Sequence, residues 1–217
     1  MSQTAPGKPA LSTREVMMLA PVIPVLTIPR AADAIPLARA LVEGGLLALE
    51  VTLRTPAAAE AIALIAREVP KAVVGAGTVL SPADWERAAG AGAGFIVSPG
   101  LTDPLAAVAA EGSLPFLPGV ATATELMRGL DAGLKAFKFF PAETSGGAAA
   151  LKALHGPFAD VRFCPTGGIT AKTAPDYLAL PNVTCVGGGW VAPAEAVEAG
   201  DWSRITELAR AAAQLGR

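Results

Sequence analysis

The chain has 217 residues, of which 52% are hydrophobic, and a formal net charge of -2 from 17 basic and 19 acidic residues. A chain of this length buries about 70% of its unfolded surface around one core, so a single domain is expected. The balanced charge, without a dense lysine and arginine run, argues against nucleic acid and anionic membranes as partners.

The N-terminal sequence predicts neither an export signal nor a membrane anchor. Met1–Ser12 is polar and lacks the basic stretch and apolar run of a secretory signal. Val16–Ile28 is apolar, but it is interrupted by prolines and too short to cross a bilayer. We therefore expect a soluble cytoplasmic protein, with residues 1–10 as a flexible N-terminal segment and residues 11–217 as one folded domain.

Ser12 and Glu15 have the spacing of a helix capping box, which predicts an extra N-terminal helix. Two further helix starts are expected where a capping residue precedes a proline, at Thr55-Pro56 and at Ser81-Pro82.

Short apolar runs alternate with alanine-rich amphipathic stretches almost to the C-terminus. The expected strands are Val22–Leu26, Leu46–Leu53, Ala72–Ala76, Gly94–Val97, Leu114–Leu117, Ala136–Phe140, Val161–Cys164 and Val183–Val186. The expected helices between them include Ala32–Glu43, Pro56–Glu68, Pro82–Ala91, Pro104–Ala110, Ala123–Ala132 and Ala148–Leu154. Repeated strand–helix units predict an α/β fold with a parallel sheet, and about eight of them fit a single-domain (β/α)8 TIM barrel. A doubly wound open sheet is the structural alternative.

The second predicted strand turns polar on one face. Side chains alternate along a strand, so Ala48, Glu50, Thr52 and Arg54 share a face. A strand inside a parallel sheet is usually apolar on both faces, and barrel enzymes keep their active sites at the carboxyl ends of their strands. Glu50 and Arg54 are therefore candidate active-site residues, with a structural ion pair or a solvated strand end as the alternative.

Lys138 stands among aromatic residues in the sixth predicted strand, on the face opposite Phe137 and Phe139. Lysine is rarely buried without a partner or a purpose. An amine desolvated near another cation such as Arg54 holds its proton less tightly and attacks a carbonyl more readily. The alternative is a lysine that extends to solvent at the sheet edge.

Glycine clusters follow the last two predicted strands, at Gly167-Gly168 and at Gly187–Gly189. Glycine lets backbone N–H groups approach a ligand closely, and barrels often bind phosphate at the loops after these strands. This placement indicates a phosphate site, although glycine pairs also occur in ordinary tight turns. Gly75–Thr78 ends the third strand and does not match a dinucleotide fingerprint, so it is interpreted as substrate wall.

His155 is the only histidine, so neither a Ser-His-Asp triad nor a histidine-ligated metal site is expected, and a helix-end or surface position is the simpler interpretation. Cys164 and Cys185 lie in apolar surroundings without CxxC spacing. This pattern predicts buried reduced thiols, with a disulfide or metal role as the alternative.

Five motifs together carry a family resemblance. They are LEVTLRT (49–55), GAGTVL (75–80), VSPG (97–100), FKFFPAE (137–143) and FCPTGGI (163–169). In this order they closely resemble 2-keto-3-deoxy-6-phosphogluconate (KDPG) and 4-hydroxy-2-oxoglutarate (KHG) aldolases, from about Val22 to Trp190. The resemblance implies a homotrimeric (β/α)8 barrel of the Entner–Doudoroff pathway, without a metal or organic cofactor.

The resemblance also implies residue roles. Lys138 matches the Schiff-base lysine and Glu50 the general acid and base. The implied binding residues are Arg54 and Thr78 on the pyruvate side, Pro99 lining the same pocket, Thr166 facing the hydroxylated carbons, and Gly167, Gly168, Gly188 and Gly189 around the phosphate. The family often carries serine where this chain has Gly189.

The implied reaction is cleavage of KDPG to pyruvate and glyceraldehyde 3-phosphate, with KHG as a second substrate. A phosphogalactonate-type or mainly KHG-cleaving aldolase would use the same lysine and glutamate. A catalytically silent, phosphate-binding trimeric scaffold is the alternative from a different class, and the intact set of Glu50, Arg54 and Lys138 argues against it.

Overall fold

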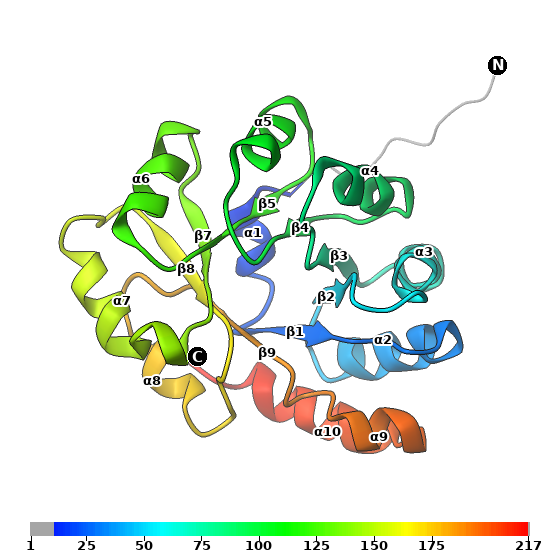
Figure 1. Ribbon diagram of the computed structural model, residues 1–217. Helices are drawn as coiled ribbons and strands as arrows, with labels where there is room; N and C mark the ends of the chain where they lie inside the picture. The colour runs from blue at the N-terminus through cyan, green and yellow to red at the C-terminus, as the bar shows by residue number, and fades with distance from the viewer. Residues whose placement is uncertain (1–10, 217) are drawn as a thin grey trace.

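The computed structural model describes residues 11–216, in which parallel strands curl into a half-barrel with helices around it (Figure 1). The N-terminal segment predicted at residues 1–10 lies outside the described residues. Within residues 11–216, no helix is long and apolar enough to span a membrane.

The strands of the described chain pair in parallel within two sheets. They are β1 (Val22–Leu26), β2 (Ala48–Thr52), β3 (Val73–Gly77), β4 (Ile96–Val97), β5 (Phe116–Leu117), β6 (Gly119–Val120), β7 (Ala136–Phe139), β8 (Arg162–Pro165) and β9 (Val186–Gly188). One sheet has the order β5-β4-β3-β2-β1-β9 and the other the order β6-β7-β8. Isolated parallel bridges join Phe163 to Val183 and Thr166 to Gly187. The predicted α/β class with parallel strands is confirmed.

Helices lie between most successive strands, before β1 and after β9. They are α1 (Thr13–Met17), α2 (Ala34–Glu43), α3 (Ala58–Glu68), α4 (Pro82–Gly90), α5 (Asp103–Glu111), α6 (Ala123–Asp131), α7 (Gly147–His155), α8 (Ala174–Leu178), α9 (Ala194–Ala199) and α10 (Trp202–Ala213), with short 3-10 turns η1 (Ala31–Asp33) and η2 (Glu143–Ser145). Ser81 caps α4 as predicted, because its hydroxyl accepts from the N–H of Asp84. Thr55 does not cap α3, which starts after Ala57. Its hydroxyl instead donates to the carbonyl of Ile28 at 2.6 Å and ties the β2–α3 loop to the end of β1.

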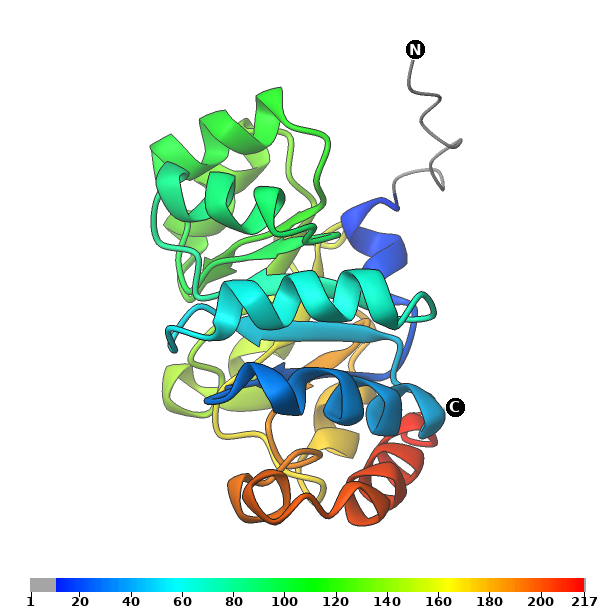
Figure 2. The same cartoon turned by 90° about the vertical axis from the view of Figure 1, so that its right-hand side faces the viewer.

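Helix α1 lies at the amino-terminal end of the strands (Figure 2). The capping box is formed: the N–H of Ser12 donates to Glu15 at 2.7 Å, and the Ser12 hydroxyl accepts from the Glu15 N–H. The buried side chains of Val16 and Met17 pack against residues such as Ala136 inside the sheets. This helix therefore closes the end opposite the predicted active site.

Side chains alternate between two apolar layers, as predicted for β2 and β7. Ala48, Ala136 and Cys164 belong to the inner layer. Leu49, Val51, Phe137, Phe139 and Phe163 belong to the outer layer that packs against the helices. Glu50, Lys138 and Thr166 each stand two positions beyond an inner-layer residue, so they face the same interior nearer the carboxyl ends.

Seven of the eight predicted strands differ from the structure in their bounds, and two of these differences have a clear physical reason. The segment predicted at Leu114–Leu117 forms the short strand β5, and Pro118, which has no N–H to donate, separates it from β6. The last strand was predicted at Val183–Val186, whereas β9 begins at Val186 and runs through Gly188, and Val183 forms only an isolated bridge. Its ladder with β1 pairs Val22 with Val186, so two of the glycines lie in a strand rather than in a loop.

Candidate active site

A cavity of about 240 Å³ opens at the carboxyl ends of the strands. Its lining residues are Val25, Thr27, Arg54, Lys138, Phe140, Thr166, Gly167, Gly168, Ile169, Gly187, Gly188 and Gly189. Seven of the predicted site residues are among them. Of the other three, Glu50 contacts Lys138, Thr78 contacts Arg54, and Pro99 is not among the lining residues.

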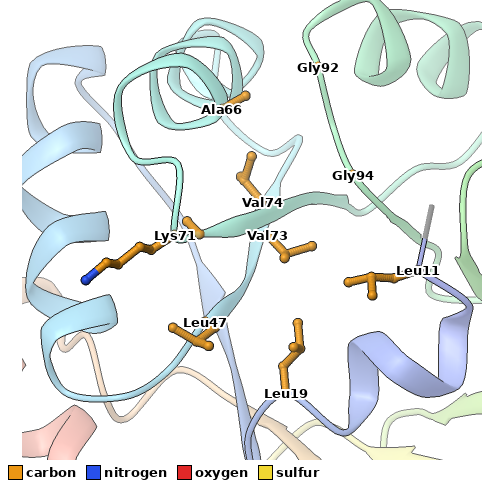
Figure 3. Close-up of a pocket in the computed structure, with 10 residues that line it drawn as sticks. Leu11, Leu19, Leu47, Ala66, Lys71, Val73, Val74, Gly92 and Gly94 are labelled. Atoms are coloured by element: carbon orange, nitrogen blue, oxygen red, sulfur yellow. The ribbon is translucent and has the colours of Figure 1, made fainter. Parts of the chain in front are cut away.

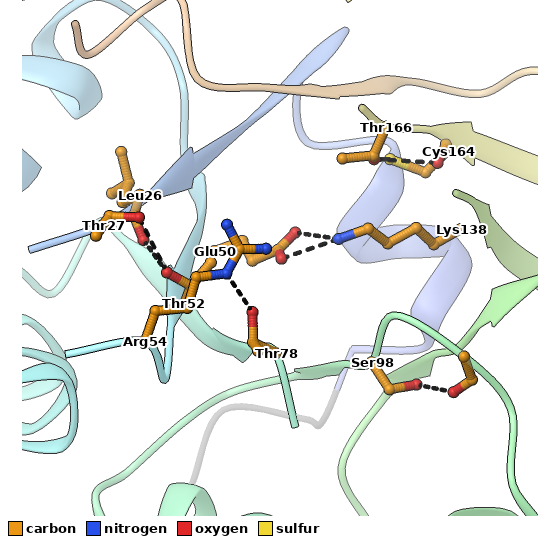
Figure 4. A network of polar contacts seen from close by, with 11 residues as sticks. Leu26, Thr27, Glu50, Thr52, Arg54, Thr78, Ser98, Lys138, Cys164 and Thr166 are labelled. Carbon is orange, nitrogen blue, oxygen red and sulfur yellow. Dashed lines mark hydrogen bonds and ion pairs between the residues drawn. The ribbon is translucent and has the colours of Figure 1, made fainter. Parts of the chain in front are cut away.

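Lys138 and Glu50 form a buried ion pair inside the sheets (Figure 4). Nζ of Lys138 lies 3.1 Å from Oε1 and 3.5 Å from Oε2 of Glu50, and the two residues are 4% and 2% exposed. The ring centroid of Phe140 lies 5.2 Å from the same nitrogen. Arg54 lines the same cavity as Lys138, as the sequence suggested, and the structure adds a carboxylate partner that the sequence did not predict. That carboxylate lies within hydrogen-bond distance of the amine nitrogen and is placed to exchange a proton with it.

Gly77 makes room for the Glu50 carboxylate. A Cβ built on Gly77 would overlap Oε1 and Cγ of Glu50, and Gly77 is itself buried in β3. Residue 77 must therefore be glycine for Glu50 to keep this position. The sequence analysis predicted only that this glycine forms part of the wall of the substrate site.

Arg54 is held at the cavity by Thr78, because its Nε donates to the Thr78 hydroxyl at 3.0 Å. Thr78 has φ of 59°, the one positive φ of a non-glycine residue within the described chain. Such a backbone costs about 1–3 kcal/mol and clusters at functional sites. Within residues 11–216 the terminal guanidinium nitrogens of Arg54 make no hydrogen bond to protein, so they are available for the paired bonds that a carboxylate accepts.

The Gly167-Gly168 loop presents backbone N–H groups. The carbonyls of Thr166 and Gly167 accept from the N–H groups of Ala142 at 2.8 Å and Glu143 at 3.1 Å. Because the peptide group is planar and trans, the N–H groups of Gly167 and Gly168 point away from these partners. Neither N–H has a protein acceptor within residues 11–216, and the two glycines have φ of 104° and 80°. Consecutive free amides of this kind form anion-binding sites.

Sequence reasoning missed several wall residues, among them Thr27, whose hydroxyl lies 3.3 Å from that of Thr52. The hydroxyl of Thr52 donates to the Leu26 carbonyl at 2.8 Å and fixes the ends of β1 and β2 together. The sequence could have indicated Thr27 as a site residue, because it follows the first predicted strand much as Thr78 follows the third.

The remaining candidates from the sequence are the two cysteines and the histidine. Cys164 and Cys185 are free and buried, and burial followed by contact with Cys164 raises the pKa of the Cys185 thiol. His155 ends α7. Within the part of the chain that the structure describes, no group of three or more His, Cys, Asp or Glu side chains could hold a metal ion.

A second cavity, of about 530 Å³, lies near the amino-terminal end of β3 beside α1 (Figure 3). Its walls are mostly apolar, with Leu11, Leu19 and Val73 among them, and Lys71 is the one charged residue that lines it. Because it holds no carboxylate or other proton-transfer group beside that lysine, the smaller cavity at the carboxyl ends is the candidate active site.

Comparisons with known proteins point to one family. The family model for KDPG and KHG aldolase matches residues 13–208. The KHG/KDPG aldolase of Escherichia coli (strain K12) is 55% identical over 203 residues, which cover 94% of this chain and 95% of that protein.

Two solved structures are similar along nearly the whole chain. The KDPG aldolase of Legionella pneumophila, with pyruvate captured at low pH as a covalent carbinolamine intermediate, has a TM-score of 0.93 and 48% identity, covering 94% of this chain and 99% of that one. The 2-keto-3-deoxy-6-phosphogluconate aldolase of Zymomonas mobilis ZM4 with 3-phosphoglycerate has a TM-score of 0.90 and 55% identity, covering 94% and 96%.

Proposed function

Because this chain belongs to the KDPG and KHG aldolase family, we propose that it is a class I, metal-independent aldolase that cleaves KDPG to pyruvate and glyceraldehyde 3-phosphate, with KHG as a second substrate. The observation that carries the proposal is the buried Lys138–Glu50 pair beside the cavity. A lysine amine with an adjacent proton acceptor is what Schiff-base formation with a ketone requires.

The pair supplies both the nucleophile and the acid of the first step. Glu50 takes a proton from the Lys138 ammonium, and the neutral amine attacks C2 of the substrate. The protonated Glu50 then returns a proton to the carbinolamine hydroxyl, which leaves as water and gives the iminium. Placement of such an acid–base group contributes about 10²–10⁴-fold in rate.

The second step breaks the C3–C4 bond. The iminium accepts the electron pair of that bond, while the Glu50 carboxylate, directly or through a water, accepts the proton of the C4 hydroxyl and the aldehyde forms. The enamine is then protonated at C3, and hydrolysis of the resulting iminium releases pyruvate and restores Lys138.

The cavity orients the substrate from two ends. Arg54, fixed by Thr78, holds the carboxylate through its terminal nitrogens, where a lysine would offer no paired bonds. The phosphate lies at the free amides of Gly167 and Gly168, with Gly188 and Gly189 on the adjoining wall. Thr166, which also lines the cavity, faces the hydroxylated carbons. This role and the place of Pro99 on the pyruvate side rest on the family resemblance.

The proposed architecture is a single-domain (β/α)8 barrel with α1 as an extra N-terminal helix. β5 and β6 are separated only by Pro118, and the isolated bridges join β8 to the β9 segment, which supports closure of the two sheets into one ring of eight strands. We further propose that the enzyme acts as a homotrimer in the cytoplasm, where a charged phosphorylated substrate is retained.

Borohydride reduction in the presence of pyruvate, followed by mass spectrometry, tests the proposal. One reduced pyruvate per chain is expected, on Lys138, with cleavage unaffected by a chelator. Labelling at Lys135, the lysine just before β7, or cleavage without any labelling, would contradict the assignment. Turnover of the C4-epimeric sugar acid and of KHG separates the gluconate assignment from the phosphogalactonate-type and KHG-type alternatives.

A further inference from the structure

Behind the Gly167-Gly168 loop, a hydrogen bond joins two residues that the proposed chemistry does not use. The hydroxyl of Tyr177, on α8, donates to Oε1 of Glu143, in η2, at 2.7 Å. Tyr177 is 2% exposed, whereas Glu143 is exposed at the other end of this bond. Burial, followed by the bond to Glu143, raises the pKa of Tyr177, so the phenol stays protonated and remains a donor at neutral pH.

Glu143 touches the loop through both its backbone and its side chain. Its N–H donates to the Gly167 carbonyl at 3.1 Å. Its methylene carbons lie against Gly168, because a Cβ built on Gly168 would come within 2.6 Å of Cγ and 2.9 Å of Cβ of Glu143. The position of the Glu143 side chain therefore constrains the peptide group that carries the Gly168 N–H.

The charge of Glu143 makes its position important. A carboxylate that swung towards the free amides would repel a bound phosphate, since like charges at short range disfavour each other. The Tyr177 hydroxyl gives that carboxylate a fixed partner on α8.

We propose that Glu143 and Tyr177 form a positioning pair that fixes the amides of Gly167 and Gly168 and thereby sets the affinity for the phosphate end of the substrate. The inference rests on the proposed function, because the loop acts on phosphate only if the substrate is phosphorylated. The pair acts through the loop and not on the reacting atoms.

Tyr177→Phe removes the hydrogen bond and keeps the buried ring. The KM for KDPG is expected to rise about three- to ten-fold, as the loss of one hydrogen bond predicts. The kcat is expected to stay within about two-fold, because no charge of the reacting groups changes. KHG has no phosphate, so its KM is expected to stay at the parent value.

A matched control is Thr206→Val, which removes another buried hydrogen bond of a hydroxyl. That bond runs from Thr206 in α10 to the Ala40 carbonyl in α2. Its loss is expected to leave the KM values for KDPG and KHG unchanged.

Glu143 variants separate positioning from charge. Glu143→Gln keeps an acceptor for Tyr177 and the methylenes over Gly168, so its KM for KDPG is expected to stay close to the parent value. Glu143→Ala loses both and should raise that KM at least as much as Tyr177→Phe. Combining Glu143→Ala with Tyr177→Phe should add little, because both changes break the same contact.

Calorimetric titration with inorganic phosphate measures the affinity of the Gly167-Gly168 loop for phosphate without any catalytic step. Weaker phosphate binding in Tyr177→Phe, with pyruvate trapping on Lys138 equal to that of the parent, is the expected result. Unchanged phosphate affinity, or equal shifts in KM for KDPG and KHG, would contradict the proposed positioning role of Glu143 and Tyr177. If Tyr177→Phe does not fold, Glu143→Ala carries the same test, since Glu143 is exposed. If the parent fails to trap pyruvate, the aldolase assignment is lost, and the phosphate titration still decides the role of the pair.

Discussion

Gly189→Ser tests the phosphate end of the proposed site by adding one hydroxyl to its wall. Gly189 lines the cavity together with Lys138 and Thr166. A Cβ built there meets only the Val25 carbonyl, at 3.5 Å, which is an ordinary contact distance, and the φ of Gly189 is not in the left-handed region. Serine therefore fits this position without strain, as its frequent use by the resembling family implies.

The expected gain follows from one charge-assisted hydrogen bond to the phosphate, which is worth about 1.5–3 kcal/mol in favourable cases. Ordering the serine side chain costs part of this, and the Val25 carbonyl competes for the hydroxyl proton at short range. A net gain of about 1 kcal/mol remains, which corresponds to roughly five-fold tighter binding of KDPG. KHG, without a phosphate, should bind as before.

Steady-state kinetics on both substrates provides the assay, with Gly189→Ala as the matched control. Alanine restricts the backbone as serine does but adds no donor, so it should leave both KM values near the parent. Equal improvement for KDPG and KHG, or the same improvement in the alanine variant, would mean that residue 189 acts through loop rigidity. No change for either substrate would mean that the existing backbone amides already satisfy the phosphate.

Two further predictions concern the reacting groups. Glu50→Gln preserves the shape of the side chain but cannot transfer a proton, so cleavage should slow by about 10²–10⁴-fold while pyruvate still binds. A cleavage rate within a few-fold of the parent would mean that another group transfers the proton. Gly77→Ala should displace the Glu50 carboxylate and lower both kcat and borohydride trapping on Lys138 by at least about ten-fold, since a misplacement near 1 Å costs on the order of 10²-fold. Gly90→Ala, at an α4 position with nothing within 4 Å of the added Cβ, is its control and should retain full activity, and similar losses in both variants would contradict the steric reasoning.

The order of elements was predictable because hydrophobic period is a local property. β1 was placed at Val22–Leu26 as the structure has it, and the face assignments in β2 and β7 hold because side chains alternate along any extended chain. The register of β9 was not predictable in this way. β-branched residues drew the predicted strand to Val183–Val186, whereas pairing with β1 selects the segment that ends at Gly188.

Glycine 187 illustrates what local pattern cannot decide. The sequence presents Gly187–Gly189 as one flexible run, but a Cβ at residue 187 would overlap the Thr166 hydroxyl, and one at residue 188 would overlap the Trp190 ring. Only at residue 189 is there room for a side chain. The three glycines thus have different constraints, which are set by Thr166 after β8, by Trp190 two positions further along the chain and by Val25 of β1.

The sequence by itself determined the strand–helix alternation, the polar face of β2 and the isolated lysine of β7, because each depends on residues a few positions apart. The tertiary structure decided that Lys138 meets the carboxylate of Glu50, 88 residues away, and that Tyr177 reaches Glu143 behind the glycine loop. Such pairings depend on how the sheets curve and on which side chains leave room, as Gly77 does for Glu50. No spacing along the chain encodes those distances.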